Sequence, residues 1–139
     1  MKIIVDKGIK QFAELIPLLH GLDDLNIRYL DPFEITRNSL DDTEVLLIRS
    51  TTKINSDLLH NSAIKFIGSA TAGFDHMDTK YLDQNDISWC YSPGCNSSSV
   101  VHYVMSSIGY LIESNFFNIN DSVGIIGYGM VGSKLSSAL

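Results

Sequence analysis

The chain contains few of the residues on which metal sites and disulfide frameworks depend. Among its 139 residues are only two cysteines, Cys90 and Cys95, and neither stands with another cysteine or a histidine cluster at a zinc-like spacing. This scarcity argues against a metal site. The first six residues reach a charge too soon for a signal peptide, and two thiols then indicate a reducing compartment. We therefore expect a cytoplasmic protein without a metal centre.

A long apolar run and an excess of positive charge are also missing. No apolar stretch approaches the roughly 20 residues that span a bilayer. Ten Lys and Arg residues stand against 16 Asp and Glu residues, which gives a formal net charge of −6. Because nucleic acids are bound by basic faces, we expect neither a nucleic acid nor a membrane as partner. A small anionic ligand remains compatible with this balance, since a local pocket can be positive.

Short β-rich runs alternate along the chain with longer helical segments, a pattern typical of a parallel α/β sheet. Hydrophobic residues make up 45% of the sequence and charged residues 19%, so a packed core is expected. The sequence predicts a flavodoxin-like layout of five strands with helical crossovers. We expect strands at 2–6, 26–30, 44–49, 64–68 and 87–91, and helices at 9–20, 56–60, 78–85 and 98–114.

Near its end the chain carries a glycine triplet of the kind found in dinucleotide-binding turns. An apolar run at 123–126 precedes it and a helix-like segment at 133–139 follows it, so strand, glycine turn and helix start occur in the required order. The backbone amides of such a turn hold the pyrophosphate of a dinucleotide. The alternative is a turn that only serves tight packing. The candidate cofactor-binding residues are Gly127, Tyr128, Gly129, Met130, Val131 and Gly132.

Polar clusters follow three of the expected strands. They occupy residues 49–53, residues 69–73 and residues 93–96, the last leading into the long helix. Ligands of doubly wound sheets bind beyond the carboxyl ends of the strands, which are neighbours at one edge. The three clusters together therefore predict a site for an anion at that edge.

Several of these segments resemble the D-2-hydroxyacid dehydrogenase superfamily. Residues 47–55, Leu-Ile-Arg-Ser-Thr-Thr-Lys-Ile-Asn, resemble its early anion-binding segment. Residues 64–78, with the run Ala-Thr-Ala-Gly-Phe-Asp-His, and residues 92–96, Ser-Pro-Gly-Cys-Asn, are similar to it as well. The resemblance covers essentially the whole chain. It implies a flavodoxin-like substrate domain at 1–96, an interdomain linker helix at 97–115 and the start of an NAD-binding Rossmann domain, truncated, at 116–139.

The resemblance implies an NAD-linked oxidation of a small phosphorylated hydroxy acid at its 2-hydroxyl group. Carried over to matching positions, Ser50 and Thr71 contact the substrate and Arg49 adds positive charge. The backbone of Ala72 and Gly73 helps to hold the carboxylate. By the same resemblance, the glycine turn binds the pyrophosphate of NAD. A homodimer is the assembly that the resemblance suggests.

The resemblance places the family's catalytic Arg, Glu and His beyond the last residue of this chain. Its four histidines, among them His76 in a loop where a turn contact is the simplest interpretation, match no catalytic position. We therefore expect a truncated form that is inactive alone. Three alternatives stay open: a phosphoglycerate-type member of the superfamily, a non-catalytic module that binds a phosphate ligand or dimerises, and a split enzyme whose second chain supplies the missing residues.

Overall fold

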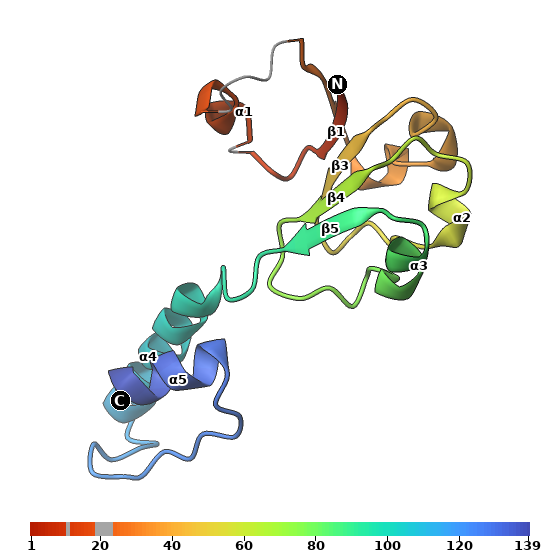
Figure 1. The fold of residues 1–139 in the computed structure, drawn as a ribbon. Helices are drawn as coiled ribbons and strands as arrows, with labels where there is room; N and C mark the ends of the chain where they lie inside the picture. Colours follow the sequence, from red (N-terminus) through yellow and green to blue (C-terminus); the bar gives the residue numbers. More distant parts are fainter. Residues whose placement is uncertain (11, 19–23) are drawn as a thin grey trace. The chain divides into compact units, whose positions relative to one another are not determined.

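The computed structural model describes residues 1–10, 12–18 and 24–139. Within these residues five strands form one parallel sheet in the order β2-β1-β3-β4-β5. Figure 1 shows β1, β3, β4 and β5 side by side. This is the flavodoxin-like order, and it confirms the predicted α/β class. The strands are β1 (Lys2–Asp6), β2 (Asn26–Leu30), β3 (Val45–Ile48), β4 (Phe66–Ser69) and β5 (Ser88–Tyr91).

The apolar core lies on one face of the sheet, against short helical segments. Strand residues Ile4, Leu46 and Ile67 are fully buried there, as expected for central parallel strands with near-continuous apolar runs. Helices α2 (Ser56–Leu59) and α3 (Thr79–Gln84) cover this face (Figure 1). So do two 3-10 turns, Pro32–Glu34 and Arg37–Ser39, whose following residues contribute to the same core.

The first helix is much shorter than the predicted 9–20. Helix α1 covers Phe12–Leu15 and passes into a 3-10 turn at Ile16–Leu18, while residues 11, 19 and 20 of the expected helix lie outside the described residues. Pro17 explains the break, because it has no N–H to donate and its ring clashes with the carbonyl of the preceding turn. The prediction overlooked this proline.

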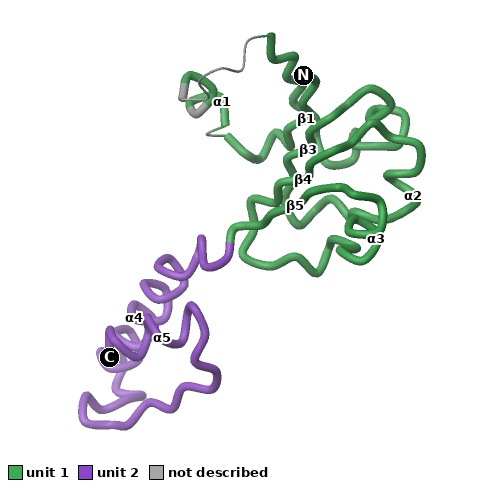
Figure 2. The backbone as a smooth tube through the Cα atoms, in the orientation of Figure 1, with its two compact units in different colours: residues 1–92 green, residues 93–139 purple. Residues whose placement is uncertain are grey.

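The chain divides into two compact units, residues 1–92 and residues 93–139 (Figure 2). The first unit contains the whole sheet. In the second, the long helix α4 (Ser97–Glu113) packs against α5 (Met130–Ala138). Lys134 of α5 donates hydrogen bonds to the hydroxyls of Ser97 (2.7 Å) and Ser98 (3.2 Å) at the start of α4.

Residues 123–126, expected as the first strand of a Rossmann unit, form no β-strand in the structure. A strand is stabilised by ladder hydrogen bonds to a neighbour. No described strand lies alongside this segment, and Ile126 is fully exposed. The glycine turn and the helix after it are nevertheless present. No helix in the described part of the chain is long and apolar enough to cross a membrane.

Candidate functional site

Two of the predicted polar clusters follow neighbouring strands of the sheet. Ile48 at the end of β3 pairs in register with Ser69 at the end of β4, and the amide of Ala70 donates to the carbonyl of Ile48. The segments 49–53 and 70–73 therefore leave the same edge of the sheet side by side. This is the edge where ligands of doubly wound sheets bind.

Arg49 does not stand free at this edge, because it binds a buried carboxylate. Its Nε (3.1 Å) and Nη2 (3.0 Å) both donate to Oδ1 of Asp6, the last residue of β1. Asp6 is completely buried and also accepts from the amide of Gly8 at 2.7 Å. The Arg49 side chain is 38% exposed, so the cation of this pair is not sealed from solvent. Sequence reasoning missed Asp6, since a single acid ending an apolar strand gives no sign of a partner far along the chain.

Thr71 belongs to a chain of hydrogen bonds that begins at His76. The His76 Nε2 lies 2.9 Å from the Ser69 hydroxyl, which lies 2.6 Å from the Thr71 hydroxyl. Thr71 donates in turn to the carbonyl of Gly73 at 2.9 Å. Burial lowers the pKa of His76, and the charge of nearby Asp75 opposes this only in part. His76 is thus bonded to a buried serine of the core edge, beyond the turn contact expected from sequence.

Several donors at this edge have no acceptor within the described protein. No hydrogen bond is found there from the backbone amides of Thr71, Ala72 and Gly73, or from the exposed hydroxyl of Ser50. The Thr52 hydroxyl is buried without a partner among the described residues. Buried polar groups are nearly always hydrogen-bonded, so such a hydroxyl calls for a water or a ligand. Unused donors on adjacent loops are what an anion requires.

A small cavity of about 200 Å³ lies on the sheet face opposite the core. Its walls include Leu47, Gly68 and Cys90, which are in register across β3, β4 and β5. Ile9 and Phe12 close it from the β1–α1 side, and Ser92 borders it at the end of β5. The cavity is mainly apolar, so it provides apolar surface rather than charge. It lies beside the segments 49–53 and 70–73, which we call the donor loops.

Three aromatic rings pack beside the loop at 70–76. The ring centroid of Phe74 lies 4.9 Å from that of Tyr91 and 5.6 Å from that of Trp89. Trp89 is fixed further by its indole N–H, which donates to Asp83 at 2.9 Å. Aromatic contacts at these distances are favourable, so they hold the loop that presents the free amides onto β5.

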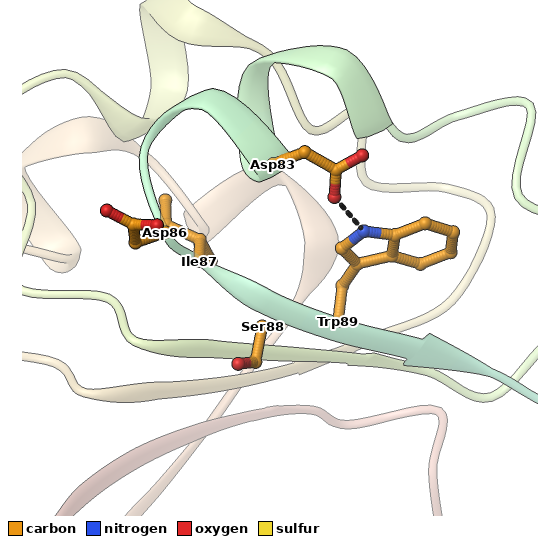
Figure 3. A pocket seen from close by; sticks show the side chains of 5 residues that line it. All are labelled: Asp83, Asp86, Ile87, Ser88 and Trp89. Atoms are coloured by element: carbon orange, nitrogen blue, oxygen red, sulfur yellow. Dashed lines mark hydrogen bonds between the residues drawn. The ribbon is translucent and has the colours of Figure 1, made fainter.

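A second hollow lies at the opposite end of β5, about 460 Å³ in volume (Figure 3). It is lined by Asp83, Asp86, Ile87, Ser88 and Trp89. Figure 3 shows the two carboxylates turned away from each other, with that of Asp83 engaged by the Trp89 indole. Because nothing converges on this hollow, it is a poor candidate site. Nor do the described residues contain a group of three His, Cys, Asp or Glu side chains that could hold a metal ion.

In the second unit, the three glycines of the turn have three different geometries. Gly127 has a φ of +96°, a conformation that favours glycine. At Gly129 a Cβ would meet no protein atom within 4 Å, which leaves space for a ligand. A Cβ on Gly132 would overlap the Gly127 carbonyl oxygen, so the helix can approach the turn only without one. These are the tight turn, the ligand approach and the close packing expected of a dinucleotide-binding fingerprint.

A flavodoxin-like sheet with free donors at its carboxyl edge, followed by a dinucleotide-type glycine turn, defines the class as an α/β protein with the features of a dinucleotide-binding fingerprint. Residues 4–129 match the family model "D-isomer specific 2-hydroxyacid dehydrogenase, catalytic domain". The chain belongs to this family of D-isomer specific 2-hydroxyacid dehydrogenases.

Curated relatives align with the whole chain. The erythronate-4-phosphate dehydrogenase of Proteus mirabilis is 42% identical over 140 residues, covering 100% of this chain and 36% of that protein. The protein of the same name from Pectobacterium carotovorum is 43% identical with the same coverage. The chain thus spans about a third of the length of these relatives.

Solved structures share the fold at lower identity. The D-lactate dehydrogenase from Aquifex aeolicus, complexed with NAD and lactic acid, matches with a TM-score of 0.72 and 19% identity over 99% of this chain and 47% of that one. The NAD⁺-bound 3-phosphoglycerate dehydrogenase of Entamoeba histolytica matches with a TM-score of 0.71 and 20% identity over 99% and 50% of the two chains.

Proposed function

We propose that this chain forms the substrate domain and the beginning of the NAD-binding domain of an erythronate-4-phosphate dehydrogenase. The reaction is the oxidation of 4-phospho-D-erythronate to 2-oxo-3-hydroxy-4-phosphobutanoate, in the biosynthesis of pyridoxal 5'-phosphate. The observation that carries the proposal is the 42–43% identity with proteins of that name along the entire chain. We assign residues 1–96 to the substrate domain, 97–115 to a linker helix and 116–139 to the start of the cofactor domain.

The donor loops at the carboxyl edge of the sheet are the proposed place for the substrate. Its carboxylate and phosphate need N–H and O–H donors, and charge-assisted bonds from an Arg strengthen such binding. The free amides of 71–73 and the exposed Ser50 hydroxyl supply neutral donors. Arg49 supplies positive charge through the N–H groups that do not bind Asp6. This arrangement supports the assignment of Ser50, Thr71, Arg49, Ala72 and Gly73 as substrate-binding residues.

The glycine turn is the proposed binding segment for NAD, which would accept the hydride from the substrate carbon. Its residues orient the cofactor by backbone donation, because the first amides of α5 have no partner within a helix. The open space at Gly129 allows the pyrophosphate to approach the backbone. By the resemblance, the family's proton-accepting His and its partners fall outside residues 1–139. We therefore expect these residues alone to bind ligand and not to turn it over.

The ligand we propose is a small phosphorylated acid and not a nucleic acid or a membrane surface. The net charge of −6 supports this choice. Homodimer formation is part of the same proposal. Three large side chains of the second unit, those of Tyr103, Tyr110 and Phe116, are at least 68% exposed and would suit a subunit contact.

A phosphoglycerate-type activity is supported less well. Identity with the Entamoeba 3-phosphoglycerate dehydrogenase is 20%, against 42–43% with the erythronate-4-phosphate dehydrogenases. At 20% the likeness shows a shared fold only.

The test is a titration of the purified chain with NADH, followed by nicotinamide fluorescence, with and without 4-phosphoerythronate. We expect saturable binding that Gly129→Val abolishes, because the branched side chain would occupy the open space beside the Gly129 Cα, where a Cβ meets no protein atom within 4 Å. Gly109→Ala, at an equally open glycine of α4, is the matched control and should bind like the parent. A folded chain that binds no NADH, or a Gly129→Val variant that binds unchanged, would contradict the cofactor assignment.

A further inference from the structure

The hydrogen bonds around Thr71 have a single possible direction, which follows from counting protons. The Gly73 carbonyl can only accept, so the one hydroxyl proton of Thr71 is used there. Thr71 must then accept from Ser69, whose own proton is thereby used. Ser69 must in turn accept from Nε2 of His76. The ring nitrogen that faces Ser69 therefore carries a hydrogen.

This series of hydrogen bonds joins the buried core to the exposed loop. Ser69 is 3% exposed and ends β4, whereas His76 is half-buried on the segment that leads into α3. The Ser92 hydroxyl also donates to the Ser69 carbonyl at 3.4 Å, and the Ser92 amide donates to the Thr71 carbonyl at 3.0 Å. The loop is thus fixed at both the hydroxyl and the carbonyl of Thr71.

The direction of donation limits what Thr71 can offer to a ligand. Its hydroxyl proton is already bound to Gly73, whereas the amides of Thr71, Ala72 and Gly73 have no acceptor among the described residues. An anion at this loop would therefore bind to backbone N–H groups. The hydrogen bonds among His76, Ser69 and Thr71 keep the loop in the conformation that presents those groups.

We propose that Ser69 and His76 are positioning residues for the anion-binding loop, acting through a directed relay from His76 to Ser69, Thr71 and the Gly73 carbonyl. The existence of the relay does not depend on the activity of the protein, whereas its effect on substrate binding rests on the proposed function. A hydrogen-bond chain in a partly buried setting polarises its members and rigidifies the segment. Neither residue touches the ligand in this proposal.

The tautomer of His76 tests the relay directly. In the ¹⁵N-labelled chain at neutral pH, long-range ¹H–¹⁵N correlations of the ring should show a protonated Nε2 and a bare Nδ1. Protonation at Nδ1 alone would overturn the relay. Ser69→Ala removes the acceptor and should shift the ring signals of His76, but not those of His60, an exposed histidine in the same unit.

Binding tests the functional half of the inference. Titration with 4-phosphoerythronate, followed at the amide signals of Thr71 to Gly73, should give a dissociation constant about fivefold to tenfold weaker for His76→Leu, as for the loss of one supporting hydrogen bond. His76→Gln keeps an N–H at the end of the side chain and should restore most of the affinity. His60→Leu is the control and should match the parent.

Equal affinity of His76→Leu and the parent would overturn the positioning role, as would a His76→Gln variant no better than His76→Leu. Failure of the parent chain to bind 4-phosphoerythronate would instead overturn the proposed substrate and with it the service of the relay to binding. The relay would then be judged by the tautomer and by the Ser69→Ala shift alone, so the two failures are distinguishable.

Discussion

At the carboxyl edge of the sheet, a buried acidic residue, Asp6, depends on a basic partner, Arg49. Asp6 is completely buried, and an ionised carboxylate in that position is strongly destabilising unless it is paired and hydrogen-bonded. Arg49 and the Gly8 amide meet that need. A side chain on Gly8 would overlap the Arg49 guanidinium, so the glycine leaves room for the pair. Arg49 is therefore structural before it is a ligand contact.

Removal of Arg49 should be costly because it leaves the Asp6 carboxylate buried with no cation beside it. We expect Arg49→Met to lower the free energy of unfolding by about 3 kcal/mol at neutral pH. Asp6→Asn should restore part of this loss when combined with Arg49→Met, because the uncompensated charge is then gone. Urea unfolding of the two single variants and the double variant forms a double-mutant cycle.

The exposed pair between Lys65 and Glu44 serves as the control for this cycle. The Lys65 side chain is 75% exposed, so Lys65→Met should cost no more than about 1 kcal/mol. Additive effects of Arg49→Met and Asp6→Asn would show that the two side chains are not energetically coupled, which contradicts the pairing seen in the structure.

Elements were predictable from the sequence where their pattern depends on local residues. The strands at 2–6 and 26–30 match the structure at both ends, and the other three strands of the sheet agree within one or two residues. Their apolar runs are bounded by polar residues, and this pattern can be recognised without knowing which strand is the partner. The short helices α2 and α3 were also anticipated, and the structure adds the side chains of Asn55 and Asp78, which cap their N-termini.

Other elements depended on information that was misread or is not local. Pro17 was a visible helix-breaking signal within the expected first helix. The segment 123–126 has the composition of a strand, but a strand needs a neighbour and none of the described strands pairs with it. Asn96, which precedes α4, has a residue type that favours helix N-termini. Its side chain nevertheless makes no capping bond, and the Ser97 hydroxyl donates instead to the Gly94 carbonyl at 2.7 Å.

The candidate site was predictable in outline only. The sequence placed three polar clusters at strand ends, and the structure brings two of them, 49–53 and 69–73, together. The sequence could not show that Arg49 binds Asp6, 43 positions away, or that His76 reaches Ser69 across a loop. Such pairings depend on how the chain folds back upon itself.

The glycine turn gives a prediction at the scale of one element. Gly132→Ala should destabilise the contact between the turn and α5, since the new methyl group overlaps the Gly127 carbonyl oxygen. Overpacking of this kind costs about 1–3 kcal/mol, so amide hydrogen exchange along Met130–Ala138 should become faster. Gly129→Ala adds a methyl group in open space and should leave exchange unchanged. Equal effects of the two variants would contradict the separate roles assigned to these glycines.

At the scale of the molecule, the apolar core belongs to one of the two units. Every residue of the buried cluster lies between Ile4 and Ile87, within residues 1–92. In the second unit only Ser97 and Val101 of α4 are buried, and α5 buries none of its residues. Because apolar burial is the main favourable term in folding, the stability of the chain should come from the first unit.

This uneven core predicts that residues 1–92 fold by themselves. The single tryptophan, Trp89, reports on that unit alone, because it packs against Phe74 and Tyr91 and donates to Asp83. Urea unfolding followed by Trp89 fluorescence should give one cooperative transition for residues 1–92, with the same midpoint as for the 139-residue chain. Residues 93–139 alone should lose their helical circular dichroism gradually, since isolated helices of this length are marginal in water.

A fragment 1–92 that shows no transition would mean that the second unit supplies stability that its exposed side chains do not suggest. A lower midpoint with a preserved transition would place a stabilising contact between residues 93–139 and the sheet, and the donor loops would then have to be studied in the longer chain.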